Sequence, residues 1–242
     1  MDDGLPGALD PELRAILEQL RVKGDPGQTP APSSPDEALA GVERLFDWGV
    51  QQNEEASVAL YSLGSSEILR RATAEVVTFL ETLGLVGPES VILQIGCGIG
   101  RFEEALAPRV AEAHGVDISI GMVGAARRRC AGLSNVHLKK TDGKSLRDYT
   151  DAGFHLVYAV DSFPYLVQSG DALVEMHFRE AARVLRGHGH LLILNYSYRS
   201  DPDRDREDIQ RLGRAHGFDV LIDGERPFNL WDGRAWLLRK GD

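Results

Sequence analysis

Three glycines in a short stretch are the residues of this chain whose types and spacing best suit chemistry. Gly96, Gly98 and Gly100 follow an apolar run over residues 91–95 and precede a helical pattern over 102–107. A buried strand, a tight turn and a helix N-terminus let the backbone come close to a nucleotide-like ligand. Glycine is required there because a Cβ would clash with the ligand or forbid the dihedral angles of the turn. We therefore expect a nucleotide-like ligand at this turn.

An acidic residue follows the glycine turn at an informative distance. An apolar segment over 112–117 predicts a second strand that ends at Asp117, 17 residues after Gly100. Dinucleotide-binding folds place a carboxylate about 20 residues after the turn, where it accepts hydrogen bonds from ribose hydroxyls. Ser119 is placed to cap the next helix, which is expected to begin near Gly121. The alternative is that Asp117 is a surface aspartate at a strand end and that its spacing from the glycines is accidental.

The spacing of the glycines separates the possible cofactors. Dehydrogenase turns read G-x-G-x-x-G, whereas here the third glycine comes one residue early and Cys97 stands between the first two. The G-x-G-x-G sequence resembles motif I of the class I S-adenosylmethionine-dependent methyltransferases. This resemblance implies that the cofactor is S-adenosyl-L-methionine. It also implies that Gly96, Cys97, Gly98 and Gly100 approach the cofactor and that Asp117 binds its ribose.

The resemblance continues along the chain in the family's order and covers about residues 88–240. Residues 141–143 look like the acidic turn after the third strand, 154–166 like the fourth strand and its loop, and 180–193 like the helix, turn and fifth strand that follow. The resemblance implies an α/β fold with a Rossmann-like, seven-stranded, mostly parallel sheet and helices on both faces. It also implies further cofactor contacts around the adenosyl group, by Ile118, Met122, Asp142, Gly143, Asp161, Ser162 and Phe163.

One position departs from the family's pattern. The family usually carries Asp or Glu two residues before the first glycine, where this chain has Gln94. A carboxylate there helps to orient the methionyl ammonium of the cofactor. Gln94 keeps an acceptor oxygen but lacks the charge, and charge-assisted hydrogen bonds are roughly twice as strong as neutral ones. Two outcomes stay open, weaker cofactor binding or substitution by another acid.

Polar and aromatic residues follow the predicted strands at the edge where open α/β sheets bind ligands. For the aromatic residues, the alternative to a binding role is plain packing. Residues expected to contact a substrate are Tyr61, Tyr165, Asn195, Tyr196 and Trp231. Asp161 is a candidate hydrogen-bond acceptor or weak base. No catalytic residue is assigned, because positioning alone can lower the barrier to methyl transfer by roughly 7–11 kcal/mol.

Strand and helix patterns alternate from residue 90 onward, which predicts a parallel sheet covered on both faces. Helices are expected between the first five strands and over 206–216, and the absence of one between the last two strands predicts a reversed final strand. The expected strands lie near 91–95, 112–117, 135–139, 154–160, 189–195, 217–222 and 234–239.

The region before the glycine turn divides into two parts. Residues 1–34 are expected to form a short amphipathic helix, over 11–23, and a flexible linker rich in Pro, Gly and Ser. Residues 35–87 are expected to form a helical lid, and residues 88–242 the S-adenosylmethionine-binding methyltransferase domain. One apolar face of the lid consists of Leu39, Val42, Leu45 and Phe46.

Composition disfavours several classes of protein. The 242 residues carry a net charge of −10 without a basic stripe, which disfavours nucleic acid as a partner. The chain has neither a secretory segment nor a membrane-spanning apolar run, so a cytoplasmic protein without a membrane partner is expected. Cys97 and Cys130 suggest no disulfide framework. His188 and His190 fall in the turn that enters the fifth strand, away from the ligand edge, and no metal site is predicted.

These patterns together predict an S-adenosylmethionine-dependent methyltransferase that acts on an O or N atom of a small molecule. One alternative is a non-catalytic S-adenosylmethionine-binding protein, toward which Gln94 points. The other is a nicotinamide-dependent oxidoreductase, which the early third glycine disfavours. The methyl acceptor and the oligomeric state do not follow from these residues, because fold does not set them.

Overall fold

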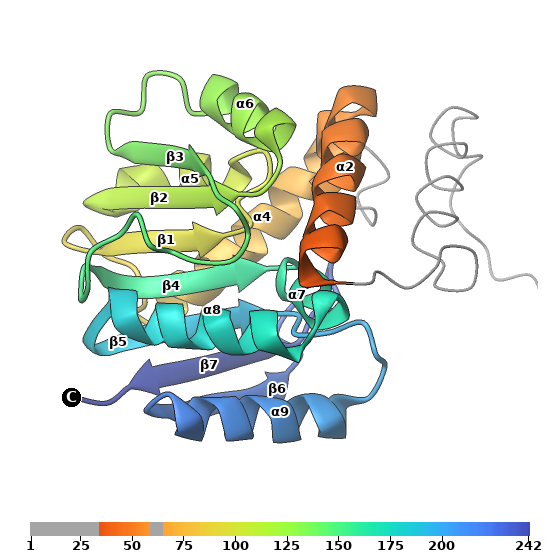
Figure 1. The fold of residues 1–242 in the computed structure, drawn as a ribbon. Helices are drawn as coiled ribbons and strands as arrows, with labels where there is room; N and C mark the ends of the chain where they lie inside the picture. The colour runs from red at the N-terminus through yellow and green to blue at the C-terminus, as the bar shows by residue number, and fades with distance from the viewer. Residues whose placement is uncertain (1–33, 59–64) are drawn as a thin grey trace, which may run out of the picture.

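Seven strands form one sheet in the order β3-β2-β1-β4-β5-β7-β6 (Figure 1). The computed structural model describes residues 34–58 and 65–242, so the helix predicted over 11–23 and Tyr61 lie outside the described residues. Strands β1 to β5 pair in parallel, and β7 runs antiparallel to both β5 and β6. The predicted seven-stranded, mostly parallel sheet with a reversed final strand is therefore confirmed. The strands are β1 Val91–Ile95, β2 Glu112–Asp117, β3 Val136–Lys140, β4 Phe154–Val160, β5 Leu185–Leu194, β6 Phe218–Glu225 and β7 Ala235–Lys240.

Helices precede the sheet and connect β1 to β2, β2 to β3 and β4 to β5. Residues 141–153 join β3 to β4 without a helix, so the helix expected there is a wrong prediction. A parallel pair needs a crossover connection, whereas the antiparallel pair β6 and β7 is joined by a loop over 226–234. The helices are α2 Pro35–Gln52, α3 Glu54–Val58, α4 Ser66–Thr82, α5 Arg101–Leu106, α6 Ile120–Arg129, α7 Phe163–Ser169, α8 Asp171–Val184 and α9 Pro202–Ala215, with a short 3-10 turn, η2, over Ala107–Arg109.

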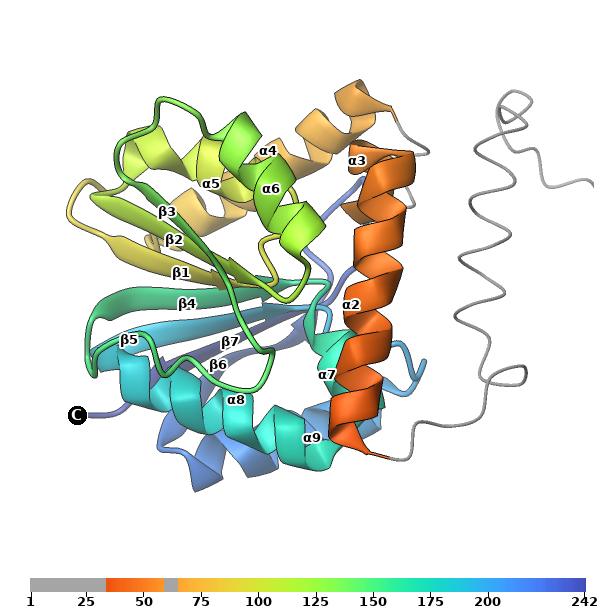
Figure 2. The same ribbon diagram turned by 45° about the horizontal axis from the view of Figure 1, so that its top comes forward.

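Helices cover both faces of the sheet (Figure 2), and an apolar core cluster packs on each face. On one face, Leu80 of α4 and Phe102 of α5 are fully buried against the strands. On the other face, Phe178 of α8 and Ile209 of α9 are likewise fully buried against the strands. The central strand β4 is buried on both sides, which explains why its sequence is an almost continuous apolar run rather than an alternating one.

Helix α2 stands across the carboxyl ends of the strands and contacts α3, α6 and α7 (Figures 1 and 2). The helix begins at Pro35 because Ser34 caps it, its Oγ accepting a hydrogen bond from the backbone N–H of Glu37 at 3.2 Å. Asp47 ties the helix to the start of α6. Its Oδ1 accepts from the Ser119 hydroxyl at 2.5 Å and from the backbone N–H of Gly121 at 3.0 Å. These bonds hold α2 over the ligand edge of the sheet.

Some element boundaries differ from the sequence-based expectations. Strand β5 begins at Leu185 rather than near 189, and α9 begins at Pro202 rather than near 206. The earlier start of α9 follows from Asp201, whose Oδ1 accepts from the backbone N–H of Arg204 at 3.1 Å and caps the helix. The predicted cap by Ser119 is confirmed, although α6 begins at Ile120.

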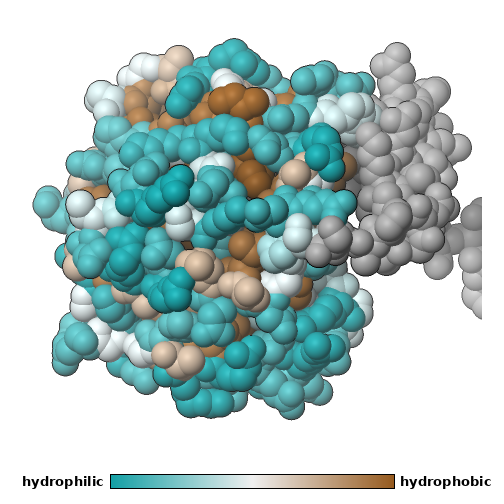
Figure 3. Space-filling model, in the orientation of Figure 1, coloured by the Kyte–Doolittle hydropathy of each residue, from teal (hydrophilic) through white to brown (hydrophobic). Residues whose placement is uncertain are grey.

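The face of the molecule in Figure 3 is mostly hydrophilic, with apolar side chains exposed in small areas. Among residues 34–58 and 65–242, no helix is long and apolar enough to cross a membrane.

Candidate functional site

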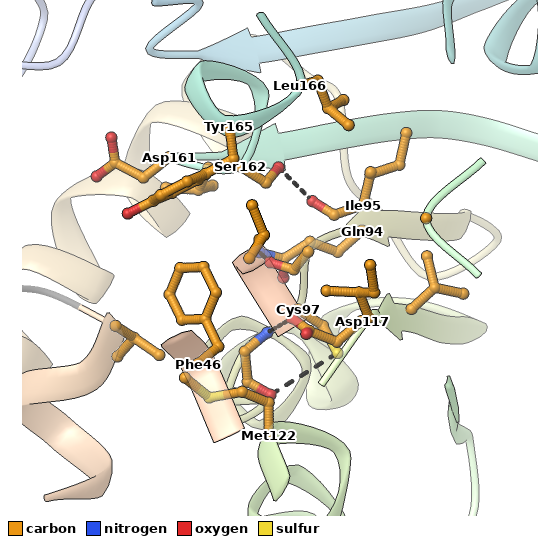
Figure 4. A pocket seen from close by; sticks show the side chains of 18 of the residues that line it. Phe46, Gln94, Ile95, Cys97, Asp117, Met122, Asp161, Ser162, Tyr165 and Leu166 are labelled. Carbon is orange, nitrogen blue, oxygen red and sulfur yellow. Dashed lines mark hydrogen bonds between the residues drawn. The ribbon is translucent and has the colours of Figure 1, made fainter. Parts of the chain in front are cut away.

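A cavity of about 370 Å³ opens at the carboxyl ends of β1, β2, β4 and β5, beneath α2 and α3. This volume falls in the range of small-molecule sites, roughly 300–1,000 Å³. Figure 4 shows its two ends, with Asp117 and Met122 on one side and Asp161 and Tyr165 on the other. The position agrees with the rule that open α/β sheets bind ligands outside the carboxyl ends of their strands.

The glycine turn forms the floor of the cavity. Gly96 and Gly98 have φ angles of +76° and +53°, a region that favours glycine. A Cβ on Gly96 would lie 2.4 Å from Cβ of Ser162, and one on Gly98 would lie 2.8 Å from a methyl carbon of Val58. Cys97 lines the cavity between them, and burial raises the pKa of its thiol, which keeps the sulfur neutral. Ser162 and Val58 therefore pack so closely on the turn that Gly96 and Gly98 leave no room for a larger residue.

Asp117 ends β2 with its carboxylate held by the backbone. Its Oδ2 accepts from the N–H of Gly98 at 2.8 Å, and its Oδ1 accepts from the N–H of Ser119 at 2.9 Å. The side chain is 8% exposed, and burial raises its pKa to about 6 against the opposing effect of these N–H groups. Each carboxylate oxygen has a second lone pair, so two acceptor positions remain for a ligand's hydroxyl groups.

Gln94, at the end of β1, faces the cavity with an unpaired acceptor. Its Nε2 donates to the carbonyl of Gly96 at 3.4 Å, while its buried Oε1 has no hydrogen-bond partner among the described residues. A buried polar atom without a partner costs free energy unless a ligand or water satisfies it. Gln94 is therefore arranged to accept a hydrogen bond from a donor on a ligand bound in the cavity.

The side of the cavity near β2 and β3 is apolar. Ile118 and Met122 line it together with Gly143, which is predicted to lie at the adenine edge. A Cβ on Gly143 would lie 2.9 Å from Ile118 and 3.1 Å from Leu39 of α2, so the wall is closely packed. A flat apolar slot of this kind suits an aromatic ring.

The opposite end of the cavity combines one carboxylate with aromatic rings. Oδ1 of Asp161 accepts from Nδ2 of Asn195 at 2.8 Å and from the hydroxyl of Tyr198 at 3.3 Å. Burial raises the pKa of Asp161. The ring of Tyr165 meets Tyr198 edge-on at 6.0 Å and Phe46 of α2 edge-on at 5.0 Å. The result is a partly enclosed acceptor flanked by three rings.

Two residues predicted to contact the cofactor do not line the cavity. At Gly100 a Cβ would lie 2.9 Å from Cβ of Ala126, so the glycine allows α5 to begin against α6. The side chain of Asp142 turns outward, where Oδ1 accepts from the N–H of Lys144 at 2.9 Å and Oδ2 lies 3.4 Å from Arg147. These bonds stabilise the turn after β3. Gly143, the next residue, lines the cavity in place of Asp142.

Phe163 and Tyr196 also lie away from the cavity. Both side chains are buried in the apolar core on the α8 face, where their ring centroids are 6.2 Å apart and Phe178 packs against Phe163. β5 ends at Leu194, and Asn195 has a φ angle of +70°, so the segment that follows is not regular strand. Asn195 and Tyr198 line the cavity, whereas Tyr196 is buried in the core. The prediction of a substrate contact at Tyr196 is corrected by this packing.

The remaining predicted positions come together around the cavity. Side chains or backbone of Ser162, Tyr165, Asn195 and Trp231 line it, as does Asp161. Ser162 is fixed by a hydrogen bond from its hydroxyl to the carbonyl of Ile95 at 2.6 Å, which Figure 4 shows.

Several lining residues were not assigned a site role from the sequence. The apolar face of α2 supplies Leu39, Val42 and Phe46, whose helical spacing was the available signal. Arg101, directly after the last glycine, lines the cavity and donates from Nη1 to Oγ1 of Thr73 at 2.9 Å. Tyr198 and Asp232 also line the cavity, and their only signal was a position after a strand. Val58 of α3 and His177 of α8 line it without any signal in the sequence.

Comparison with known proteins agrees with this geometry. Residues 92–189 match a family model described as Methyltransferase domain. Phosphoethanolamine N-methyltransferase 1 of Arabidopsis thaliana is 28% identical over 145 residues, which cover 59% of this chain and 28% of that protein. The chain thus spans under a third of the length of this curated relative.

Two solved structures show the same fold. Phosphoethanolamine N-methyltransferase 1 of Haemonchus contortus, in complex with phosphoethanolamine and S-adenosylhomocysteine, matches with a TM-score of 0.65 and 17% identity over 89% of this chain and 50% of that one. The [4+2]-cyclase SpnF matches with a TM-score of 0.61 and 19% identity over 88% of this chain and 98% of that one. At these identities the likeness concerns the fold.

Residues 92–189 therefore match a methyltransferase domain, and the solved structures share the fold of this chain. The predicted fold class is confirmed, and the domain match agrees with the predicted family of class I S-adenosylmethionine-dependent methyltransferases, its class of enzyme and its cofactor.

Proposed function

We propose that this protein transfers the methyl group of S-adenosylmethionine to an N or O atom of a small molecule bound beside Asp161. The observation that carries the proposal is the arrangement of the cavity. One end has an apolar slot and a backbone-held carboxylate, and the other has a partly enclosed carboxylate between aromatic rings. The first end suits the nucleoside of the cofactor, and the second suits a methyl acceptor that carries an N–H or O–H group.

The cofactor-binding roles follow from the contacts at the first end. Asp117 has acceptor positions left for the two ribose hydroxyls, and Ile118 and Met122 flank the adenine. Oε1 of Gln94 accepts a hydrogen bond from the methionyl ammonium, which satisfies an otherwise orphaned buried acceptor. When bound, the cofactor supplies an electrophilic methyl group. The protein orients the acceptor atom in line with it.

The acceptor class follows from the charges of the side chains that line the cavity. Three aspartates line the cavity, Asp117, Asp161 and Asp232, and the lining residues described include a single Lys or Arg side chain, Arg101. An acidic, aromatic pocket favours an amine, a phenol or an alcohol over a phosphate ester. The two phosphoethanolamine methyltransferases resemble this chain in fold. We therefore propose an acceptor other than phosphoethanolamine for this chain.

Asp161 is the residue proposed to touch the acceptor. Its Oδ1 is occupied by Asn195 and Tyr198, and Oδ2 has no hydrogen-bond partner among the described residues. A carboxylate whose pKa is raised by burial is a better base than an exposed one. Asp161 thus receives the proton of the attacking N–H or O–H group, while Asn195 and Tyr198 fix its orientation.

We further propose that residues 35–87 act as a lid on a cofactor-binding domain over 88–242. The contacts of α2 support this division, because Asp47 bonds the start of α6, and Lys140 and Lys144 pair with Glu43 and Asp36 at 2.9 and 2.6 Å. The free thiols Cys97 and Cys130 suit a reducing compartment, so a cytoplasmic location without a nucleic-acid or membrane partner is part of the proposal.

A first experiment tests the cofactor by isothermal titration with S-adenosylmethionine, S-adenosylhomocysteine and NADH. The proposal expects binding of the two sulfur nucleosides and none of NADH. Binding of the nucleosides without methyl transfer to any amine, phenol or alcohol would support the non-catalytic alternative. Binding of NADH alone would support an oxidoreductase.

A second experiment tests Asp161 with the isosteric variant Asp161→Asn. The expected result is a fall in kcat of about 10²- to 10⁴-fold on the best acceptor found, the usual effect of removing a general base. The dissociation constant for S-adenosylmethionine should stay within about twofold, since Asn keeps the acceptor for Asn195 and Tyr198. Asp142→Asn, an exposed aspartate away from the cavity, is the control. Equal activity of the two variants would refute the role of Asp161.

A further inference from the structure

Two histidines and a glutamate meet on the edge of the sheet, outside the cavity. Strand pairing sets His114 of β2 directly beside His137 of β3, and β3 is an edge strand (Figure 1). Glu112 lies two residues before His114 and so projects from the same face of the sheet. The three side chains offer ligand atoms that all lie within 4.8 Å of one another.

We propose that Glu112, His114 and His137 form a binding site for a divalent transition-metal ion of the zinc class. Two imidazoles and one carboxylate are donors that suit Zn²⁺ and its neighbours rather than Mg²⁺ or Ca²⁺. Three protein ligands leave a coordination position for water or another outside ligand.

The distances agree with this assignment. Oε2 of Glu112 lies 2.9 Å from Nε2 of His114 and 3.8 Å from Nε2 of His137. Zinc bonds of about 2.0–2.2 Å and tetrahedral angles place neighbouring ligand atoms ~3.3–3.6 Å apart. These two distances lie on either side of that interval, and all three ligand atoms lie within 4.8 Å of one another.

One positive charge and one aromatic ring border the site. Lys139, on the same strand and face as His137, is the positive charge nearby, and its Nζ lies 5.0 Å from the centre of the Tyr149 ring. Tyr149 in turn meets His114 edge-on at 5.6 Å, which limits the movement of the imidazole.

A plain His114–Glu112 hydrogen bond does not account for the whole cluster. His137 is 43% exposed and lies 3.8 Å from the carboxylate, beyond hydrogen-bond distance, yet its ring lies 4.6 Å from that of His114. A bound ion would tie β2 to the edge strand β3, next to the connection that brings Thr141 and Gly143 to the cavity. The site is therefore structural in effect and separate from methyl transfer.

The test uses the full chain without a histidine tag, titrated with ZnCl₂ in competition with a chromophoric chelator. The wild type should bind one equivalent of zinc, and its Tm should rise by at least about 2 °C in excess zinc. His137→Gln and Glu112→Gln should each weaken binding by at least about tenfold. These side chains are about half exposed, so both variants should keep the wild-type circular dichroism spectrum.

His188→Gln is the matched control, because His188 is 67% exposed, pairs with Asp242 and lies in β5, which is three strands away from β2 in the sheet. It should bind zinc as the wild type does, and MgCl₂ should neither bind nor raise Tm in any variant. The inference is overturned if the wild type binds no zinc, or if His137→Gln binds as tightly as His188→Gln. Neither outcome affects the proposed methyl transfer, which is measured separately.

Discussion

Glu103, in the first turn of α5, is a carboxyl group buried without hydrogen-bond partners among the described residues. Its side chain is 0% exposed, and neither oxygen is paired. Oε1 lies 2.7 Å from the position that a Cβ on Gly115 of β2 would occupy, so the glycine makes room for it. The pKa of Glu103 is raised from 4.5 to about 8. Burial is the largest cause and the charge of Asp117 adds to it, while the protein backbone and Arg101 oppose the shift. We predict that Glu103 is protonated in the folded protein at neutral pH.

The sign and size of the effect on stability follow from this shift. Between pH 4.5 and 8 the folded chain holds a proton on Glu103 that the unfolded chain has released. The free energy of unfolding therefore decreases as the pH rises, by about 1.4 kcal/mol for each pH unit. From pH 5 to pH 8 the loss due to this one group is on the order of 4 kcal/mol. Glu103→Gln removes the titration and keeps the shape of the side chain.

The assay is urea unfolding followed by the fluorescence of the buried Trp236, at several pH values from 5 to 8. The free energy of unfolding of Glu103→Gln minus that of the wild type should rise by about 4 kcal/mol over this range. Glu104→Gln is the control, because Glu104 is 47% exposed and paired with Arg129 at 3.2 Å, and its difference from the wild type should stay flat. A difference for Glu103→Gln that changes by less than about 1 kcal/mol would refute the protonated state.

Two further predictions concern the cofactor end of the cavity. Asp117→Asn should weaken S-adenosylmethionine binding by about 10- to 100-fold in isothermal titration, the equivalent of one hydrogen bond to a charged group. Because burial raises the pKa of Asp117 to about 6, wild-type affinity should fall as the pH drops from 7.5 to 5, and the variant should lose this dependence. Unchanged affinity would contradict the ribose contact. Gly98→Ala should abolish binding, since its Cβ would lie 2.8 Å from Val58. Gly84→Ala, with a similar φ of +66° and open space, should cost stability without affecting affinity.

The local elements of the fold could be predicted because their causes lie in neighbouring residues. β1 occupies residues 91–95, as the apolar run before the glycines predicted, and Ser119 caps α6 because its hydroxyl reaches an N–H three residues on. The start of α9 was missed although Asp201 and Pro202 are common at helix starts. That error came from overlooking a local signal.

The composition of the cavity walls was harder to predict than its position. Phe163 and Tyr196 are on the right segments, but which side of the backbone meets the cavity depends on how α7 and the end of β5 pack on α8. Tyr198 had no signal in the sequence beyond its position after a strand. Its bond to Asp161, 37 residues away, exists only because β4 and β5 pair side by side.

The sequence by itself determined the order of strands and helices, the glycine turn and the carboxylate at the end of β2, because each is encoded by residue spacing along one stretch of chain. Only the tertiary structure brought His137 beside His114 and Asp161 beside Tyr198. It also buried Glu103 without a partner. Those contacts join residues that are distant in the chain, and they depend on strand register and helix packing, which no single stretch of sequence contains.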